Sequence, residues 1–221
     1  MKEITFKQVK NCEEINMYIE KGDSVLGVLG ITEHSKAHAM KVAATAGNIL
    51  KQLGYPEHVI ELAKITGYMH DIGNCVNRHD HAHNGAILAF QILKGLDMKP
   101  EDIATIVAAI GNHDEKTGTA VDAVSAAVIL ADKTDVRRNR VRNREKSMFD
   151  IHDRVNYAAV SSKLHINSEN KTIHLEIELD DKMCSVMDYF EIFLQRMLMC
   201  KRAAEFFDMK FKMTANGSKV C

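Results

Sequence analysis

Apolar residues recur at three- and four-residue steps through much of the first 135 residues, which is the spacing of amphipathic helices. The pattern is clearest over residues 35–53, where Val42, Ile49 and Leu53 share one stripe and Gly54 follows as a C-cap. A first amphipathic helix ends near Gly22. Five consecutive helices with short polar connections are then predicted, at residues 35–53, 56–70, 80–93, 100–113 and 120–138. This order predicts a helical bundle.

The hydrophobic pattern changes after about residue 155. The segments "AAVSSKLHI" and "KTIHLEIEL" are rich in β-formers, and "NSENK" between them has the composition of a turn, so they predict a β-hairpin. A long helix over residues 183–207 and a short third strand in "MKFKMTA" are expected to follow. We therefore predict a mostly α protein, with a helical domain over residues 1–155 and a small C-terminal α+β subdomain over residues 156–221.

Composition narrows the class of protein. The 221 residues are 46% hydrophobic and 27% charged, with a net charge of -1, so no basic surface for nucleic acid is expected. No apolar run has the length of a membrane span. The five scattered cysteines form no C-x-x-C pair, and the first residues do not resemble a signal peptide, so a cytoplasmic location is expected. The methionine-rich late helix favours packing or a homodimer interface.

Several helical stripes begin or end in a residue that can bind metal. A single histidine on an apolar face is usually a satisfied core group, but a set of such residues at helix ends predicts a shared polar centre. The set is His38, His70, Asp71, His81, His113 and Asp132. Its mixed nitrogen and oxygen donors suit one or two divalent ions, among them Mn, Fe, Mg, Ni, Co or Zn, in open sites. Asp71 is suited to bridge two ions, which would form a hydrolytic centre.

The order H…HD…D, carried by "HAMKVAATAGNILKQLG", "YMHDIGN" and "AVILADKTD", resembles the HD superfamily of metal-dependent phosphohydrolases. The resemblance covers roughly residues 33–135 and implies a helical HD domain. It makes His38, His70, Asp71 and Asp132 the primary metal ligands, with His70 and Asp71 at the centre of catalysis. The segments "HAHNGA" and "IGNHDE" are similar to the extra histidines of the two-metal branch, which includes the HD-GYP phosphodiesterases, and this places His81 and His113 on a second ion.

The sequence departs from that family in two places. Many HD enzymes continue the dipeptide as H-D-x-G-K, but Asn74 stands where the lysine would be. The Gly-Tyr-Pro element of the HD-GYP group is absent after His113, where the chain continues "DEKTGTA". Cyclic dinucleotide hydrolysis of the HD-GYP kind is therefore not expected.

Further residues are candidates for the site. His34 precedes His38 by four residues, so it is a possible additional ligand or substrate contact, or else a solvated residue before the helix. Lys133, Arg137 and Arg140 lie in the most basic run of the chain and are assigned to substrate phosphate, with a solvated face or an inter-domain clamp as the alternative. Arg144 belongs to the same run.

The sequence thus predicts hydrolysis of a phosphomonoester or phosphodiester by metal-activated hydroxide, with a nucleotide as the expected substrate. Two other classes stay open. One is a regulatory module that binds metal or nucleotide without catalysis, which Asn74 in place of lysine keeps in view. The other is a di-iron enzyme of the oxygenase type on the same scaffold.

Overall fold

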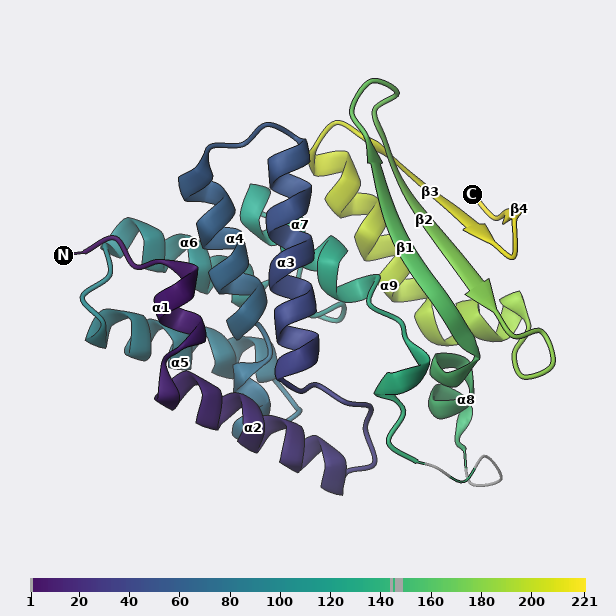
Figure 1. Cartoon of the computed structure of the whole chain (residues 1–221), viewed down its shortest axis with the longest axis horizontal. Helices are drawn as coiled ribbons and strands as arrows, with labels where there is room; N and C mark the ends of the chain where they lie inside the picture. Colours follow the sequence, from purple (N-terminus) through teal and green to yellow (C-terminus); the bar gives the residue numbers. More distant parts are fainter. Residues whose placement is uncertain (1, 144, 146–148) are drawn as a thin grey trace.

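A layer of helices forms the first two thirds of the molecule in the computed structural model, which describes residues 2–143, 145 and 149–221 (Figure 1). The helices of this part are α1 (Phe6–Lys10), α2 (Glu13–Val28), α3 (Lys36–Gln52), α4 (Glu57–Met69), α5 (His81–Gly95), α6 (Pro100–Gly111) and α7 (Ala123–Lys133), and a short 3-10 helix, η1 (Ile72–Cys75), lies between α4 and α5. The predicted helical bundle is confirmed.

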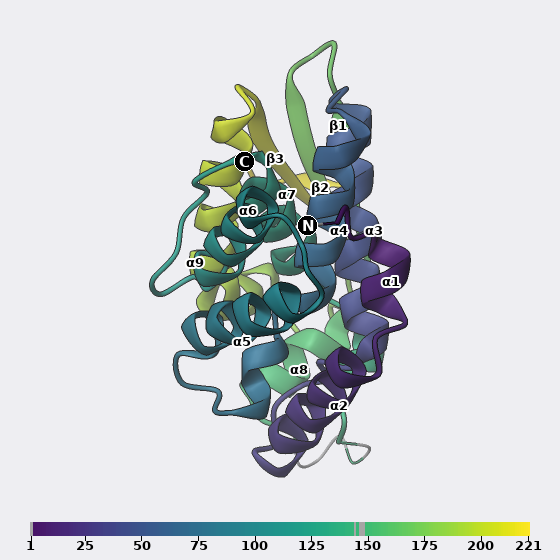
Figure 2. The same cartoon turned by 90° about the vertical axis from the view of Figure 1, so that its left-hand side faces the viewer.

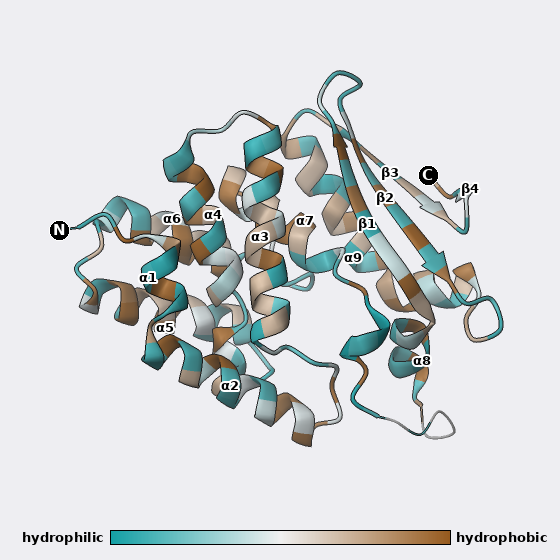
Figure 3. Cartoon of the chain, viewed as in Figure 1, coloured by the Kyte–Doolittle hydropathy of each residue, from teal (hydrophilic) through white to brown (hydrophobic). Residues whose placement is uncertain are grey.

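Helix α7 is the centre of this bundle. It contacts α3, α4 and α6 on the bundle side and α9 on the other (Figure 2). The middle of α7, from Ala126 to Leu130, consists of apolar residues with no exposed surface, as expected for a helix surrounded by others. The outer helices are amphipathic instead, and hydrophobic and hydrophilic residues alternate along α2, α3 and α4 (Figure 3).

Helix α7 ends earlier than the sequence predicted. A helix to residue 138 was expected, but α7 stops at Lys133, where the Thr134 hydroxyl donates a hydrogen bond to the Leu130 carbonyl at 2.6 Å. Extended residues and a short 3-10 helix, η2 (Arg138–Arg140), follow. This part of the prediction was wrong because the arginines of the basic run are held by contacts with other segments rather than by a helix. Arg144 lies outside the described residues.

The C-terminal part consists of α8 (Ile151–Ala158), β1 (Ala159–Asn167), β2 (Thr172–Leu179), α9 (Val186–Phe206), β3 (Lys210–Ala215) and β4 (Ser218–Lys219). The strands form one sheet in the order β1-β2-β3-β4. The β1–β2 hairpin is antiparallel as predicted, and β3 lies parallel to β2 because α9 crosses over between them. The mostly α fold with a small α+β appendage is therefore confirmed.

One hydrophobic core runs through both parts. Helix α9 packs against α7, and buried residues of the bundle and of the sheet belong to the same cluster. The predicted division between residues 155 and 156 falls inside α8, so it stays a sequence-based prediction. Among the described helices, none has the length and apolar character needed to cross a membrane.

Candidate metal centre

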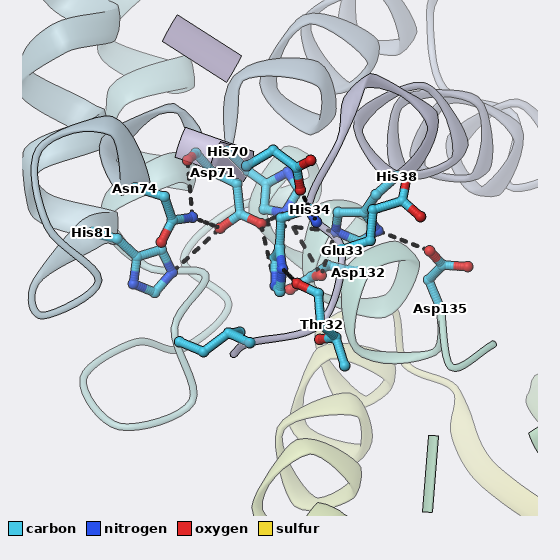
Figure 4. Close-up of polar contacts among 12 residues, drawn as sticks. Thr32, Glu33, His34, His38, His70, Asp71, Asn74, His81, Asp132 and Asp135 are labelled. Carbon is cyan, nitrogen blue, oxygen red and sulfur yellow. Dashed lines mark hydrogen bonds and ion pairs between the residues drawn. The ribbon is translucent and has the colours of Figure 1, made fainter. Parts of the chain in front are cut away.

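The six predicted ligands come together at one end of the bundle. Each lies at or next to a helix end: His38 in the first turn of α3, His70 and Asp71 after α4, His81 at the start of α5, His113 after α6 and Asp132 in the last turn of α7. Helix ends place side chains at a common point because the helices converge there. Most of this set is drawn in Figure 4.

Asp71 lies at the middle of the cluster, and its two oxygens face different histidines. Oδ2 is 3.2 Å from His70 Nε2 and 3.8 Å from His38 Nε2. Oδ1 is 3.4 Å from His81 Nε2 and 3.7 Å from His113 Nε2. A carboxylate that presents one oxygen to each of two ligand groups has the arrangement of a bridging ligand.

Asp132 completes the first of these groups. Its Oδ1 is 3.3 Å from His38 Nε2 and 3.6 Å from His70 Nε2. We call the group of His38, His70, Asp71 and Asp132 the first subsite. The second subsite is Asp71, His81 and His113, and its two histidine Nε2 atoms are 3.2 Å apart. Both subsites offer nitrogen and carboxylate oxygen, which suits open coordination of a divalent ion.

The four histidines of the cluster share one orientation. Each ring directs Nε2 to the centre and uses Nδ1 for a hydrogen bond to an oxygen outside it, as metal-binding histidines almost always do. The Nδ1 contacts are His38 to Asp135 Oδ2 (2.8 Å), His70 to the Gly67 carbonyl (2.8 Å), His81 to the Arg78 carbonyl (3.2 Å) and His113 to the Ile110 carbonyl (2.6 Å). With the proton on Nδ1, each Nε2 lone pair is free to bind a metal.

Two atoms of the first subsite have no partner without an ion. Nε2 of His38 and Nε2 of His70 are buried and, among the described residues, have no hydrogen bond of acceptable geometry. Burial lowers the pKa of His70, but the carboxylates of Asp71 and Asp132 outweigh it and raise this pKa to about 10. A cation at Nε2 is thus strongly favoured, and a metal ion meets the same demand. The residues present fit a divalent metal.

The second subsite differs in its electrostatics. Burial lowers the pKa of His81 to about 4, against the attraction of Asp71. His81 is therefore neutral at neutral pH, which is the form that binds metal. Burial raises the pKa of Asp71, but the surrounding histidines, His70 first, hold it well below its usual range, so the bridging carboxylate is ionised.

Gly73 allows the second subsite to form. A Cβ atom at this position would overlap the His81 carbonyl oxygen and the backbone of Gly85. Only glycine therefore lets η1 lie against the first turns of α5, which brings Asp71 to His81. Asn74 then fixes the carboxylate, because its side-chain amide donates to Asp71 Oδ1 at 2.9 Å and to the Asp71 carbonyl at 3.0 Å.

Comparison with known proteins agrees with this geometry. The family model described as "HD domain" matches residues 36–156, more than half of the chain. The chain belongs to the HD domain family. An uncharacterized protein of Methanocaldococcus jannaschii is 28% identical over 198 residues, which cover 79% of this chain and 75% of that protein.

Two further similarities are more limited. Ribonuclease Y of Thermosipho melanesiensis is 28% identical over 116 residues, which are 52% of this chain but only 22% of ribonuclease Y. A crystal structure of a predicted HD superfamily hydrolase from an uncultured Thermotogales bacterium is 22% identical. It covers 56% of this chain and 67% of that one, with a TM-score of 0.44.

His34 lies at the edge of the HD-domain cluster. Ser35 is the N-cap of α3, so His34 precedes the helix and does not continue the stripe of His38. Its ring still follows the common orientation, with Nδ1 on the Thr32 carbonyl at 2.6 Å and Nε2 3.9 Å from Asp71 Oδ2 (Figure 4). Burial lowers its pKa well below the usual value, so His34 is neutral. Its role as an additional ligand or substrate contact stays a prediction.

Lys133 follows the predicted ligand Asp132 and lies beside it. Its Nζ is 2.8 Å from Asp132 Oδ2 and 2.9 Å from Glu115 Oε2, and its side chain is 6% exposed. Burial lowers the pKa of Lys133, but the two carboxylates raise it above its usual value, so the ammonium is retained. This cation holds Asp132 in the HD-domain centre, whereas its assignment to substrate phosphate stays a prediction.

Arg137 and Arg140 lie one step further out, around Asp135. The Arg137 guanidinium donates to both Asp135 oxygens, at 2.6 and 2.9 Å, and buried Arg140 donates to the carbonyls of Asp135 and Glu33 at 2.8 and 2.9 Å. Asp135 in turn accepts from His38 Nδ1. These contacts are on the side of His38 that faces away from the centre. The phosphate role predicted for the two arginines remains untested, and the contacts shown are structural.

Sequence reasoning missed three residues of this HD domain: Asp135, Glu115 and Arg78. Asp135 follows Asp132 by three residues, and that spacing could have marked it, but the expected helix hid its contact with His38. Arg78 Nη1 donates to Asn74 Oδ1 at 3.3 Å and lies 4.0 Å from Asp71 Oδ1, with its side chain 31% exposed. Nothing in the sequence distinguished Arg78 or Glu115 from surface charges.

Two cavities adjoin the cluster and share Arg78, Glu115 and Lys116 in their walls. The first, of about 330 Å³, includes His81 and Asp114. The second, of about 350 Å³, includes Thr32, His34, His152 and Arg196. His79 and His83, with side chains 87% and 58% exposed, belong to no metal-binding group among the described residues. The HD-domain centre therefore opens on the side of Arg78.

Proposed function

We propose that this HD domain is a metal-dependent phosphohydrolase that cleaves a phosphomonoester or phosphodiester. The observation that carries the proposal is the position of Asp71, whose oxygens each face a separate set of histidine Nε2 atoms. The first subsite would hold one ion and the second subsite another, with Asp71 between them. A divalent ion bound there would activate water at neutral pH and neutralise charge on the phosphoryl oxygens.

The protein's own residues prepare the site for this chemistry. His38, His70, His81 and His113 are fixed by their Nδ1 contacts, so no reorientation is needed when a ligand arrives. Asn74 holds the bridging carboxylate by its Oδ1 and its backbone carbonyl.

Arg78 is proposed as the first contact for the substrate phosphate. It is partly exposed, lies beside Asp71 and lines both adjoining cavities. The lysine that many HD enzymes carry after the glycine is Asn74 here, and Asn74 brings no charge of its own but binds Arg78. The planar donor group of arginine suits phosphate oxygens. Lys116, which lines the same cavities, is the second proposed cation.

A nucleotide is the proposed substrate class. The adjoining cavities, at about 330 and 350 Å³, fall at the lower end of small-ligand sites, and their walls combine the cations Arg78 and Lys116 with acidic side chains such as Glu115. The similarity to ribonuclease Y over half of the chain makes short RNA a second substrate to test.

The test is a screen of nucleotides, simple phosphate esters and short RNA with added Mn²⁺, run beside elemental analysis of the purified protein. Hydrolysis should be lost in Asp71→Asn and retained in Asp102→Asn. Asp102 is a suitable control because it is also a buried carboxylate paired to a histidine, His58, at 2.8 Å. Tight ligand binding without turnover would favour a regulatory module, and two irons with oxygen consumption would favour an oxygenase. Either outcome overturns the proposal.

A further inference from the structure

A separate polar cavity lies between the helical layer and the sheet. It has a volume of about 320 Å³ and is bounded by α3, the end of α7 and β1. Its polar walls are formed by Lys41, Thr45, Asn48, Ser162, Lys163 and His165.

Local structure explains why polar groups gather there. Lys41, Thr45 and Asn48 follow the i, i+4, i+7 spacing of one helical face, so they form a continuous stripe on α3. Strand β1 and the turn that follows it are each joined to the helical layer by one hydrogen bond. The Ser162 hydroxyl donates to the Thr134 carbonyl at 2.7 Å, and the Ser168 hydroxyl donates to the Gln52 carbonyl at 3.4 Å.

The cavity carries an excess of positive charge. Within residues 2–143, 145 and 149–221, no ion pair or side-chain hydrogen bond is found for Lys41 or Lys163. His165 is 3.1 Å from Glu176, which is the cross-strand partner of Lys163. The carboxylate in the wall, Asp135, already has two arginines and a histidine as partners. Lys41 and Lys163 are exposed wall residues on α3 and β1, and among the described residues neither forms an ion pair, so together they favour an anion in the cavity.

This cavity is distinct from the metal centre. None of the six cluster residues lines it, although Ala131, which precedes Asp132 in the chain, and Asp135, which contacts the outward-facing Nδ1 of His38, belong to its wall. The cavities that adjoin the cluster are lined by Arg78, Glu115 and Lys116 instead. An anion bound here therefore occupies a second site.

We infer that this cavity binds a phosphate-bearing small molecule, at most the size of a mononucleotide. Lys41 and Lys163 would bind the phosphate from opposite walls, and the Thr45, Asn48 and Ser162 side chains supply further polar contacts. The volume is at the lower end of the range for small-ligand sites, which excludes large cofactors. The inference does not depend on the proposed catalytic activity.

The test is a titration of the ¹⁵N-labelled full chain with inorganic phosphate at constant ionic strength, followed by amide chemical shifts. Saturable shifts are expected for residues 41–48 and 161–165. In Lys41→Ala/Lys163→Ala the apparent Kd should rise at least about tenfold, because two charge-assisted contacts are lost. The control Lys51→Ala/Lys212→Ala also removes two exposed lysines from α3 and the sheet, but outside the cavity. It should bind as the wild type does.

Two results would overturn the inference. In the first, the double cavity variant keeps wild-type affinity while its amide spectrum stays folded. In the second, saturable shifts are confined to residues around Asp71 and disappear in Asp71→Asn, which would mean that phosphate binds at the metal centre alone. If the cavity variant does not fold, the titration of Asp71→Asn still tests the inference. Phosphate should then still shift the amide signals of residues 41–48 in Asp71→Asn, and their absence would overturn the inference.

Discussion

Replacing Asp135 by asparagine tests whether the oxygen behind His38 matters for metal binding. Asp135 Oδ2 is 2.8 Å from His38 Nδ1, and the carboxyl side chain is 2% exposed. Burial raises the pKa of Asp135, but His38 and Arg137 hold it well below the usual range, so the group is ionised at neutral pH. The asparagine side chain would keep the size and one acceptor oxygen but remove the charge that makes the His38 ring a stronger donor to metal.

The expected loss is measurable in two quantities. Removal of a partner behind a metal-binding histidine typically weakens metal affinity about 10- to 100-fold, which corresponds to about 1.4–2.8 kcal/mol. The free energy of unfolding should also fall by about 1.5–3 kcal/mol, because charge-assisted hydrogen bonds from His38 and Arg137 are weakened. In Asp135→Asn the buried Arg140 guanidinium would lie beside a neutral side chain instead of a carboxylate. This should lower the free energy of unfolding further without changing the metal affinity.

Metal affinity is measured by calorimetric titration with Mn²⁺, and stability by urea unfolding of the same samples. Asp102→Asn is the matched control, since it also removes a buried carboxylate that accepts a hydrogen bond from a histidine, His58, at 2.8 Å. Asp102 lies in the first turn of α6, roughly 16 Å along the helix from His113. Asp102→Asn should lose stability but bind Mn²⁺ as the wild type does. Equal Mn²⁺ affinity in Asp135→Asn and wild type would refute the reasoning.

Three further predictions concern the centre and its support. His113→Ala should reduce the metal content to that of the first subsite, whereas Asp71→Ala should lose metal from both, as elemental analysis would show. Gly73→Ala should destabilise the chain by about 1–3 kcal/mol in urea unfolding because its Cβ overlaps backbone, while Gly95→Ala, with nothing within 4 Å, should not destabilise it. Burial raises the pKa of Glu115, but neighbouring cations, Lys133 first, lower it below the usual 4.5. Ionised Glu115 therefore contributes fully to the free energy of unfolding above pH 4.5, and this contribution is lost as the pH falls through the lowered pKa. The free energy of unfolding of the wild type, measured in urea, should therefore exceed that of Glu115→Gln by about 1.5–3 kcal/mol at pH 7. This difference should shrink below pH 4.5, and a difference that stays constant with pH would contradict the prediction.

Helices with strong periodicity could be predicted from the sequence, and so could the cluster at their ends. The stripe that begins at His38 and the stripes that end in His70 and His113 place these residues on the buried side, and the structure brings them together there. The hairpin could also be predicted from the sequence, because strict alternation in "TIHLEIEL" specifies one buried face. Both inferences depend on residues within one element.

Contacts between irregular segments could not be predicted in this way. Asp135 lies past the end of α7, where the chain leaves helical geometry, and its partner His38 is 97 residues away. Arg140 reaches the Glu33 carbonyl across 107 residues. No periodicity links such positions, since they are determined by how separate elements pack. The sequence therefore did not reveal that Arg137 and Arg140 contact Asp135, and their predicted role in binding substrate phosphate stays a prediction.

The C-terminal appendage acts on the metal centre through a chain of charges. Arg196 of α9 stacks on Phe193 and lies 3.4 Å from Glu115, which is 2.9 Å from Lys133, which in turn is 2.8 Å from the ligand Asp132. Every link joins opposite charges, so each fixes the next side chain in one orientation. Lys133 contacts Asp132 on one side and Glu115 on the other, so three successive ion pairs connect Arg196 of α9 to Asp132. The appendage therefore supports the cluster through these ion pairs, in addition to the hydrophobic core that joins the two parts of the chain.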